Sequence, residues 1–310
     1  MLQPTACPAL LFTAFKNYSY VGRMKKLKQV IQDIKVLLPE SSAELDALLA
    51  QYLFYAPKIP LRLAQEQLLK KAEAGQLTVF DEFFSGTELK VNIFKWGSGT
   101  QRIFITHGWG SKAADFTDII SALLDTGDVE VVAFDAPGNG SSEGTLSNLL
   151  LYVLAFKAAV LKYGRPDVVI GHSLGAMANV SALGELEIVP KLLVSITPLI
   201  RLKENFEASM DALSIDKDYQ ARILGNFALR FGVPASHFTL GRYYDFNEQF
   251  NHWLFYDSND MISPYAYLKK FMEEHPAINT KDYNGVGHER ILKSPEMIAD
   301  LVAAVVAIRF

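Results

Sequence analysis

The sequence predicts an α/β fold in which a mostly parallel central sheet is flanked by helices. From residue 77 onward, short apolar runs alternate with stretches of helical periodicity, an order typical of parallel sheets. This alternation stops over residues 199–250, which have the length of an inserted helical cap. Before residue 77 the pattern is helical, and we therefore expect an N-terminal helical extension over residues 1–76.

The N-terminal extension is expected to contain three helices. They cover residues 25–37, 41–55 and 61–74, with apolar side chains at helical spacing. Ser41 or Ser42 is the expected N-cap of the second helix, and Gly75 is expected to end the third. Residues 1–23 contain an apolar run without the flanking charges of a signal peptide, and we expect them to be disordered or peripheral.

The core is expected in two parts, residues 77–198 and residues 251–310. Its strands are predicted at residues 77–84, 89–96, 102–106, 129–134, 167–170, 191–197 and 252–256. Ser85-Gly86-Thr87-Glu88 joins the first two as a hairpin, and the alternation with helices makes the remaining strands parallel.

Residues 171–175 read Gly-His-Ser-Leu-Gly, directly between an apolar strand and a helix of small residues. This is the setting of a nucleophile elbow. A serine on such a sharp turn needs neighbours without a Cβ, which the glycines supply. The turn raises the Ser173 hydroxyl above the sheet edge and directs the backbone N–H of Leu174 into the same space.

A serine that attacks an acyl group needs a second N–H donor for the oxyanion. The predicted strand 102–106 ends in the sequence His-Gly-Trp-Gly at residues 107–110, and the N–H of Trp109 is our candidate. The alternative is that this stretch is only a connection between a strand and a helix.

The serine also needs a base, usually a histidine held by a carboxylate. His288 is our candidate, because it follows the flexible sequence Asn284-Gly285-Val286-Gly287 and precedes the last amphipathic helix. The other histidines are expected to have structural, packing or surface roles; they are His107, His172, His237, His252 and His275.

The acid should follow a strand between Ser173 and His288. The predicted strand 252–256 leads into a loop with two aspartates. Asp260 lies farther into the loop, where its side chain can reach an imidazole, and we expect it to be the acid. Asp257 sits at the end of the strand and is expected to brace the turn.

These motifs together resemble an α/β-hydrolase fold protein of the bacterial esterase and lipase type. The resemblance rests on residues 107–110, 135–142 and 171–175, with Asp260 and Gly287-His288, in the order and spacing of that family. It implies Ser173 as nucleophile, Asp260 as acid and His288 as base, with the N–H groups of Trp109 and Leu174 as oxyanion hole. The N-terminal part resembles a poorly characterised bacterial subfamily without an assigned substrate.

Composition limits the partners and the compartment. A net charge of −4 and a pI near 5.9 argue against nucleic-acid binding. The single cysteine, Cys7, cannot form an intramolecular disulfide and fits a reducing compartment, so we expect a cytoplasmic protein. The longest apolar stretch, residues 146–160, is too short and too interrupted for an integral membrane span.

The function we expect is that of a serine hydrolase cleaving a carboxylic ester of small to moderate size through an acyl-enzyme. No cofactor or metal is needed, and the substrate is expected to carry an apolar acyl group. The same triad would serve a thioesterase, an acyltransferase, an amidase or a C–C hydrolase. A non-catalytic binding protein of this fold is a further alternative. The aromatic residues of segment 199–250 either form a lid over Ser173 or only pack the cap onto the core.

Overall fold

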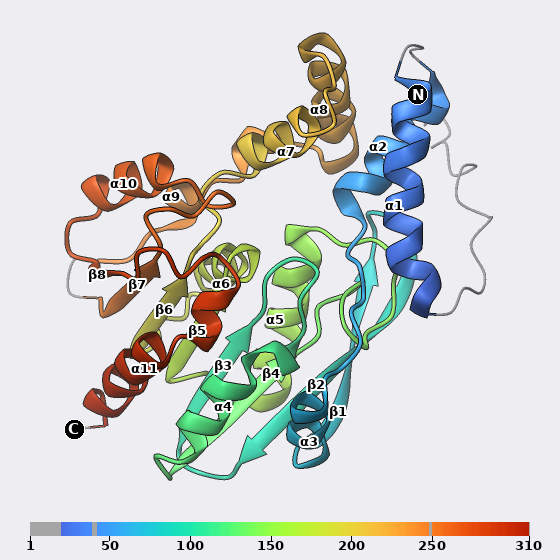
Figure 1. The fold of residues 1–310 in the computed structure, drawn as a ribbon. Coiled ribbons are helices and arrows are strands. Elements are labelled where there is room, and N and C mark those ends of the chain that lie inside the picture. Colours follow the sequence, from blue (N-terminus) through green and yellow to red (C-terminus); the bar gives the residue numbers. More distant parts are fainter. Residues whose placement is uncertain (1–19, 39–41, 248–249, 310) are drawn as a thin grey trace, which may run out of the picture.

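The computed structural model describes residues 20–38, 42–247 and 250–309. Eight strands form one sheet in the order β1-β2-β4-β3-β5-β6-β7-β8 (Figure 1). The strands are β1 (Glu73–Asp81), β2 (Thr87–Gly97), β3 (Gln101–Thr106), β4 (Val129–Phe134), β5 (Val168–His172), β6 (Leu192–Ile196), β7 (His252–Tyr256) and β8 (Asn279–Asp282).

The sheet has the expected mixed topology. β1 and β2 form an antiparallel hairpin, and β2 is also antiparallel to β4. All later pairings are parallel. β5 lies between β3 and β6, so the strand that carries the Ser173 motif is central, and the loops after its neighbours open at the same edge. The prediction of the fold class is therefore confirmed.

Helices cover both faces of this sheet. The α-helices of the described residues are α1 (Tyr20–Leu37), α2 (Ala43–Phe54), α3 (Leu63–Lys70), α4 (Thr117–Leu124), α5 (Leu149–Tyr163), α6 (Leu174–Glu185), α7 (Leu202–Asp211), α8 (Lys217–Phe231), α9 (Leu240–Tyr243), α10 (Tyr265–Glu274) and α11 (Pro295–Ala307). One apolar core packs α5 and α6 on the sheet, and the other packs α4 and α11. Within the described ranges, no helix is both long and apolar enough to cross a membrane.

The prediction of a third helix over residues 61–74 is wrong at its C-terminal end. α3 ends at Lys70, and β1 begins at Glu73. Gly75 lies within β1, opposite Ile93 of β2. The residues 71–74 have good helix propensity, but pairing with β2 outweighs this local preference. The sheet therefore begins inside the segment expected to be a helical extension.

The start of the N-terminal extension also differs from expectation. Residues 20–23, expected to be disordered or peripheral, begin α1, and residues 1–19 lie outside the described part of the chain. Ser42 is the N-cap of α2, since its hydroxyl accepts the N–H of Leu45 at 3.1 Å. Ser41 lies outside the described residues.

The first two helices, α1 and α2, pack together near the upper end of the sheet, and α2 contacts α8 of the cap segment (Figure 1). Asp46 of α2 accepts hydrogen bonds from Tyr219, at 2.6 Å, and from Arg222, at 2.5 Å, both on α8. Phe54 at the end of α2 meets Phe206 of α7 edge to face, with ring centroids 5.7 Å apart. The cover over the sheet therefore has two parts, α1–α2 and α7–α8, which touch each other.

A buried histidine joins the cap to the core. His252 begins β7, lies 2.9 Å from the hydroxyl of Ser195 and 3.1 Å from that of Tyr244, and is fully buried. Burial, aided by the nearby His275, lowers the pKa of His252 from 6.5 to about 3. The folded protein therefore keeps this imidazole neutral where the unfolded chain protonates it.

This linkage predicts a stability change with pH. Between the two pKa values the unfolded state binds one more proton at residue 252, so stability falls as pH decreases from 6.5 toward 3. In His252→Gln the unfolded state cannot bind this extra proton. The slope of the unfolding free energy against pH should therefore be smaller by about 1.4 kcal/mol per pH unit in this range. Urea unfolding of both proteins at several pH values measures it, and equal slopes would contradict the assignment.

Candidate active site

Ser173 stands on a strained turn between β5 and α6. Its φ of 53° and ψ of −122° are unusual for a residue with a side chain, and strain of this kind is concentrated at functional sites. The turn is held because the N–H of Ser173 donates to the carbonyl of Ile196 at 3.0 Å. A Cβ on Gly171 would lie 2.5 Å from the Cα of Ala176, and one on Gly175 would lie 2.3 Å from the carbonyl oxygen of His107. Both glycines are therefore required by close backbone contacts.

A cavity of about 810 Å³ lies above the carboxyl ends of the parallel strands. Ser173 and His288 both line it, together with Trp109, Leu174 and His172. Ser173 is only 7% exposed, because the cap and α2 cover this edge of the sheet. The cavity thus gathers four of the five residues expected at the site.

The fifth, Asp260, lies behind His288. Nδ1 of His288 is 2.5 Å from Oδ2 of Asp260, and the Asp260 side chain is 1% exposed. Its other oxygen accepts the N–H groups of Ile262 and Ser263, at 2.7 and 3.0 Å. Burial alone would raise the pKa of Asp260, but the contact with His288 and these N–H groups lower it below its ordinary value. The carboxylate is thus ionised and directed at one nitrogen of the imidazole.

Asp257 has a different position. Its carboxylate accepts the N–H groups of Asn259, Gly285 and Gly287, at 2.8, 3.0 and 2.5 Å. These bonds join the loop after β7 to the loop that carries His288. Burial raises the pKa of Asp257, but these backbone donors outweigh it and leave the pKa below its ordinary value. The structure therefore brings Asp260, not Asp257, to the imidazole.

His172 supports His288 from the other side, a contact that sequence reasoning missed. Its Nε2 donates to the backbone carbonyl of His288 at 2.9 Å, and the two rings lie 4.8 Å apart. Burial and the neighbouring His288 lower the pKa of His172 to about 3, so this ring stays neutral. No local signal could have revealed the contact, because the two residues are 116 positions apart.

Two backbone N–H groups are available near Ser173. Leu174 is the first residue of α6, so its N–H has no acceptor within the helix. Trp109 follows Gly108, where a Cβ would come within 3.0 Å of the Cβ of Ser173. The loop after β3 therefore lies directly against the serine.

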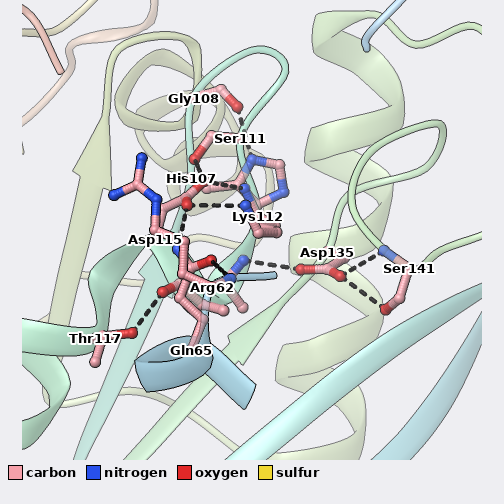
Figure 2. Close-up of polar contacts among 12 residues, drawn as sticks. Arg62, Gln65, His107, Gly108, Ser111, Lys112, Asp115, Thr117, Asp135 and Ser141 are labelled. Carbon is pink, nitrogen blue, oxygen red and sulfur yellow. Dashed lines mark hydrogen bonds and ion pairs between the residues drawn. The ribbon is translucent and has the colours of Figure 1, made fainter. Parts of the chain in front are cut away.

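A polar group holds the continuation of this loop, as Figure 2 shows. Asp115 accepts bonds from Gln65, Ser111 and Lys112, at 2.7, 2.7 and 2.9 Å. Asp135 accepts the N–H of Ala113 at 2.8 Å, which ties the same loop to the end of β4. Lys112 is nearly buried and its charge is matched by Asp115, so we assign this group to loop structure.

Part of the cavity lining is apolar. It includes Leu149, Leu150, Phe54, Phe206, Phe227 and Phe231. Three of these aromatic residues belong to the cap, as the lid interpretation expects, whereas Phe54 comes from α2. Leu229 of the cap is 85% exposed instead, and Tyr244 packs against Phe271 of α10. The apolar residues of the cap therefore differ in role: some line the cavity, Tyr244 packs on α10, and Leu229 is exposed.

The sequence and the fold were compared with those of known proteins. Residues 103–301 match the alpha/beta hydrolase family, which is well over half of the chain. The chain belongs to that family. Across the residues described, no group of three His, Cys, Asp or Glu side chains could hold a metal ion.

Individual relatives are more distant. A 2-hydroxy-6-oxononadienedioate/2-hydroxy-6-oxononatrienedioate hydrolase of Burkholderia vietnamiensis is 35% identical over 118 residues, which is 35% of this chain and 40% of that protein. The match thus spans about two fifths of the relative's length. An esterase of Pyrococcus furiosus superposes with a TM-score of 0.57 at 18% identity, covering 82% of this chain and 96% of the esterase. A bromoperoxidase of Bacillus anthracis gives a TM-score of 0.54 at 12% identity, over 76% of this chain and 100% of that one. At these identities the structures support the fold alone.

Proposed function

We propose that this α/β-hydrolase cleaves a carboxylic ester through an acyl-enzyme formed on Ser173. The observation that carries the proposal is the arrangement at the cavity. Ser173, on the strained turn between strand and helix, lines the same cavity as His288. Nδ1 of His288 is hydrogen-bonded to the buried carboxylate of Asp260. This combination is the working arrangement of a nucleophile, a base and an orienting acid.

In the proposed reaction, the hydroxyl oxygen of Ser173 attacks the ester carbonyl while Nε2 of His288 takes its proton. Asp260 holds Nδ1–H and stabilises the imidazolium. The N–H groups of Trp109 and Leu174 donate to the oxyanion of the tetrahedral intermediate. Collapse breaks the bond to the alcohol, which leaves with the proton from His288. Water then repeats the sequence on the acyl-enzyme and releases the acid.

The test is hydrolysis of p-nitrophenyl esters of increasing acyl length, beside acyl-coenzyme A thioesters and a fluorophosphonate probe that labels activated serines. We expect stoichiometric labelling and preference for the oxygen esters. Faster turnover of thioesters would make the protein a thioesterase with the same machinery. Absence of both labelling and turnover would contradict an enzymatic role and favour a binding protein.

We place the acyl group of the substrate against the apolar part of the cavity lining. Phe231 is half-buried there, and its ring is tilted against that of Phe227 with ring centroids 4.3 Å apart. Phe231→Ala should therefore enlarge the cavity and shift the preferred acyl length upward, changing the ratio of kcat/KM between long and short esters about tenfold. Labelling by a small fluorophosphonate should be unchanged.

Phe80→Ala is the matched control, because Phe80 is 55% exposed on β1 and does not line the cavity. The control should leave the ratio unchanged. If Phe231→Ala also leaves it unchanged, the acyl group lies elsewhere.

Hydrolysis of a carbon–carbon bond is the second candidate. The partial match to the Burkholderia hydrolase favours it, since the name of that relative describes dienedioate and trienedioate substrates with two carboxylates. Three exposed cations that also line the cavity, Arg62, Arg290 and Lys293, would suit such an anionic substrate. Loss of the dienoate absorbance on incubation would favour this reaction over ester cleavage.

A further inference from the structure

A buried tyrosine hydroxyl lies directly beneath the loop against Ser173. Tyr152 is on α5 and is fully buried, and its hydroxyl donates to the carbonyl of Gly108 at 2.9 Å. Nδ1 of His107 lies 2.6 Å from the same oxygen. Nε2 of His107 accepts the N–H of Ala136 at 2.9 Å, so the ring carries its proton on Nδ1 and donates to Gly108 as well. One carbonyl thus accepts bonds from two buried side chains, in addition to the backbone N–H of Ser111 at 3.3 Å.

These bonds fix the direction of the next N–H group. The described peptide bonds are all trans, and in a trans peptide the C=O and N–H point in opposite directions. The carbonyl of Gly108 faces His107 and Tyr152 in the core, so the N–H of Trp109 faces the other way. Trp109 lines the cavity on that side. On its far side, the N–H of Gly110 donates to the side-chain oxygen of Asn139 at 3.0 Å, which limits rotation of the loop.

We propose that Tyr152 is a positioning residue for catalysis, whose hydroxyl aims the N–H of Trp109 at the oxyanion. The proposal rests on the proposed acyl transfer at Ser173. Oxyanion donors are effective because they are oriented before the charge develops. Loss of the Tyr152 bond would leave Gly108 held by His107 and by the longer bond from the N–H of Ser111. The peptide could then rotate, and the donor would be weaker in the transition state.

The protonation of both donors suits this role. Burial, together with the charge of Asp135, raises the pKa of Tyr152 well above its ordinary value, so the phenol keeps its proton. Burial lowers the pKa of His107, despite the opposing charge of Asp135, so the ring keeps the neutral form that accepts from Ala136 and donates to Gly108. The arrangement is therefore stable at neutral pH.

Tyr152→Phe is the direct test, since it removes one oxygen and keeps the ring that packs edge to face on His107. We expect kcat for a p-nitrophenyl ester to fall about tenfold with KM within about twofold, because the lost interaction acts in the transition state. A phenylboronic acid should lose affinity by a similar factor. Ser173 Oγ adds to its boron while the serine proton passes to His288, which gives a tetrahedral anion resembling the intermediate.

Tyr163→Phe is the matched control, at the other end of the same helix and only half-buried. It should leave kcat and boronate affinity unchanged. If Tyr152→Phe leaves kcat within twofold of the wild type, or lowers kcat without weakening boronate binding, the positioning role is wrong. Fluorophosphonate labelling of the unmodified protein tests the proposed function separately, because it does not depend on residue 152.

Should Tyr152→Phe fail to fold, 3-fluorotyrosine at position 152 keeps the hydroxyl and the packing while making it a stronger donor. We then expect kcat to change at least twofold relative to 3-fluorotyrosine at position 163. Equal kcat values for the proteins with 3-fluorotyrosine at position 152 and at position 163 would overturn the proposal.

Discussion

Ser173→Ala is expected to reduce kcat for ester hydrolysis by about 10³-fold or more, because it removes the only atom proposed to bond to the acyl group. The residual rate should come from binding and from the oxyanion donors alone. Steady-state kinetics with the best p-nitrophenyl ester measures this loss. The variant should also fail to react with the fluorophosphonate, since the probe bonds to the same oxygen.

The fold should tolerate this change, although the turn at position 173 is strained. Alanine keeps a Cβ and therefore keeps the same backbone penalty at φ 53°. Circular dichroism and thermal unfolding should match those of the wild type. Ser181→Ala is a suitable control, because Ser181 is buried on the same helix, α6, away from the cavity lining. A Ser173→Ala protein that retains more than about a tenth of the activity would show that another residue is the nucleophile.

Asp260→Asn is expected to lower kcat/KM by about 10³- to 10⁴-fold. The amide lacks the charge that stabilises the imidazolium, and its NH₂ group favours the wrong tautomer of His288. Fluorophosphonate labelling should slow by a similar factor, because the probe also needs an activated serine.

Asp257→Asn is the contrasting variant, three positions away at the end of β7. Its amide oxygen can still accept the N–H groups of Asn259 and Gly285, so kcat/KM should fall less than about tenfold. The larger effect should be on stability, since the bond from Gly287 is lost: its N–H would face the amide NH₂, which is a donor. Unfolding must be measured for both proteins, because a partly unfolded Asp257→Asn would mimic a catalytic loss. A folded Asp257→Asn that is the more impaired enzyme would mean that the acid is misassigned.

The sequence determined much of this protein because its signals are local. Alternating apolar runs and helical stretches predicted the sheet, because a buried strand consists of a short run of apolar residues that can be recognised locally. The Gly-His-Ser-Leu-Gly stretch predicted the turn at Ser173, because a strained backbone between a strand and a helix needs glycines at fixed neighbouring positions. His288 was singled out among the histidines because it follows a glycine-rich loop and precedes the last helix.

The features that sequence reasoning missed depend on distant partners. Glu73 and Ala74 favour a helix locally, and only pairing with β2 places them in a strand. The apolar pattern of α2 predicted a helix but not the neighbour on which it packs, so its contacts with α7 and α8 came from the tertiary structure.

Only the tertiary structure shows which aspartate contacts the imidazole. Asp260 lies 2.5 Å from Nδ1 of His288, whereas Asp257 accepts three backbone N–H groups. The supports of the site, His172 beneath His288 and Tyr152 beneath Gly108, are contacts between residues 116 and 44 positions apart. Hydrogen bonds of this kind leave no periodicity in the sequence, because each depends on two side-chain or backbone atoms that only the folded sheet brings together.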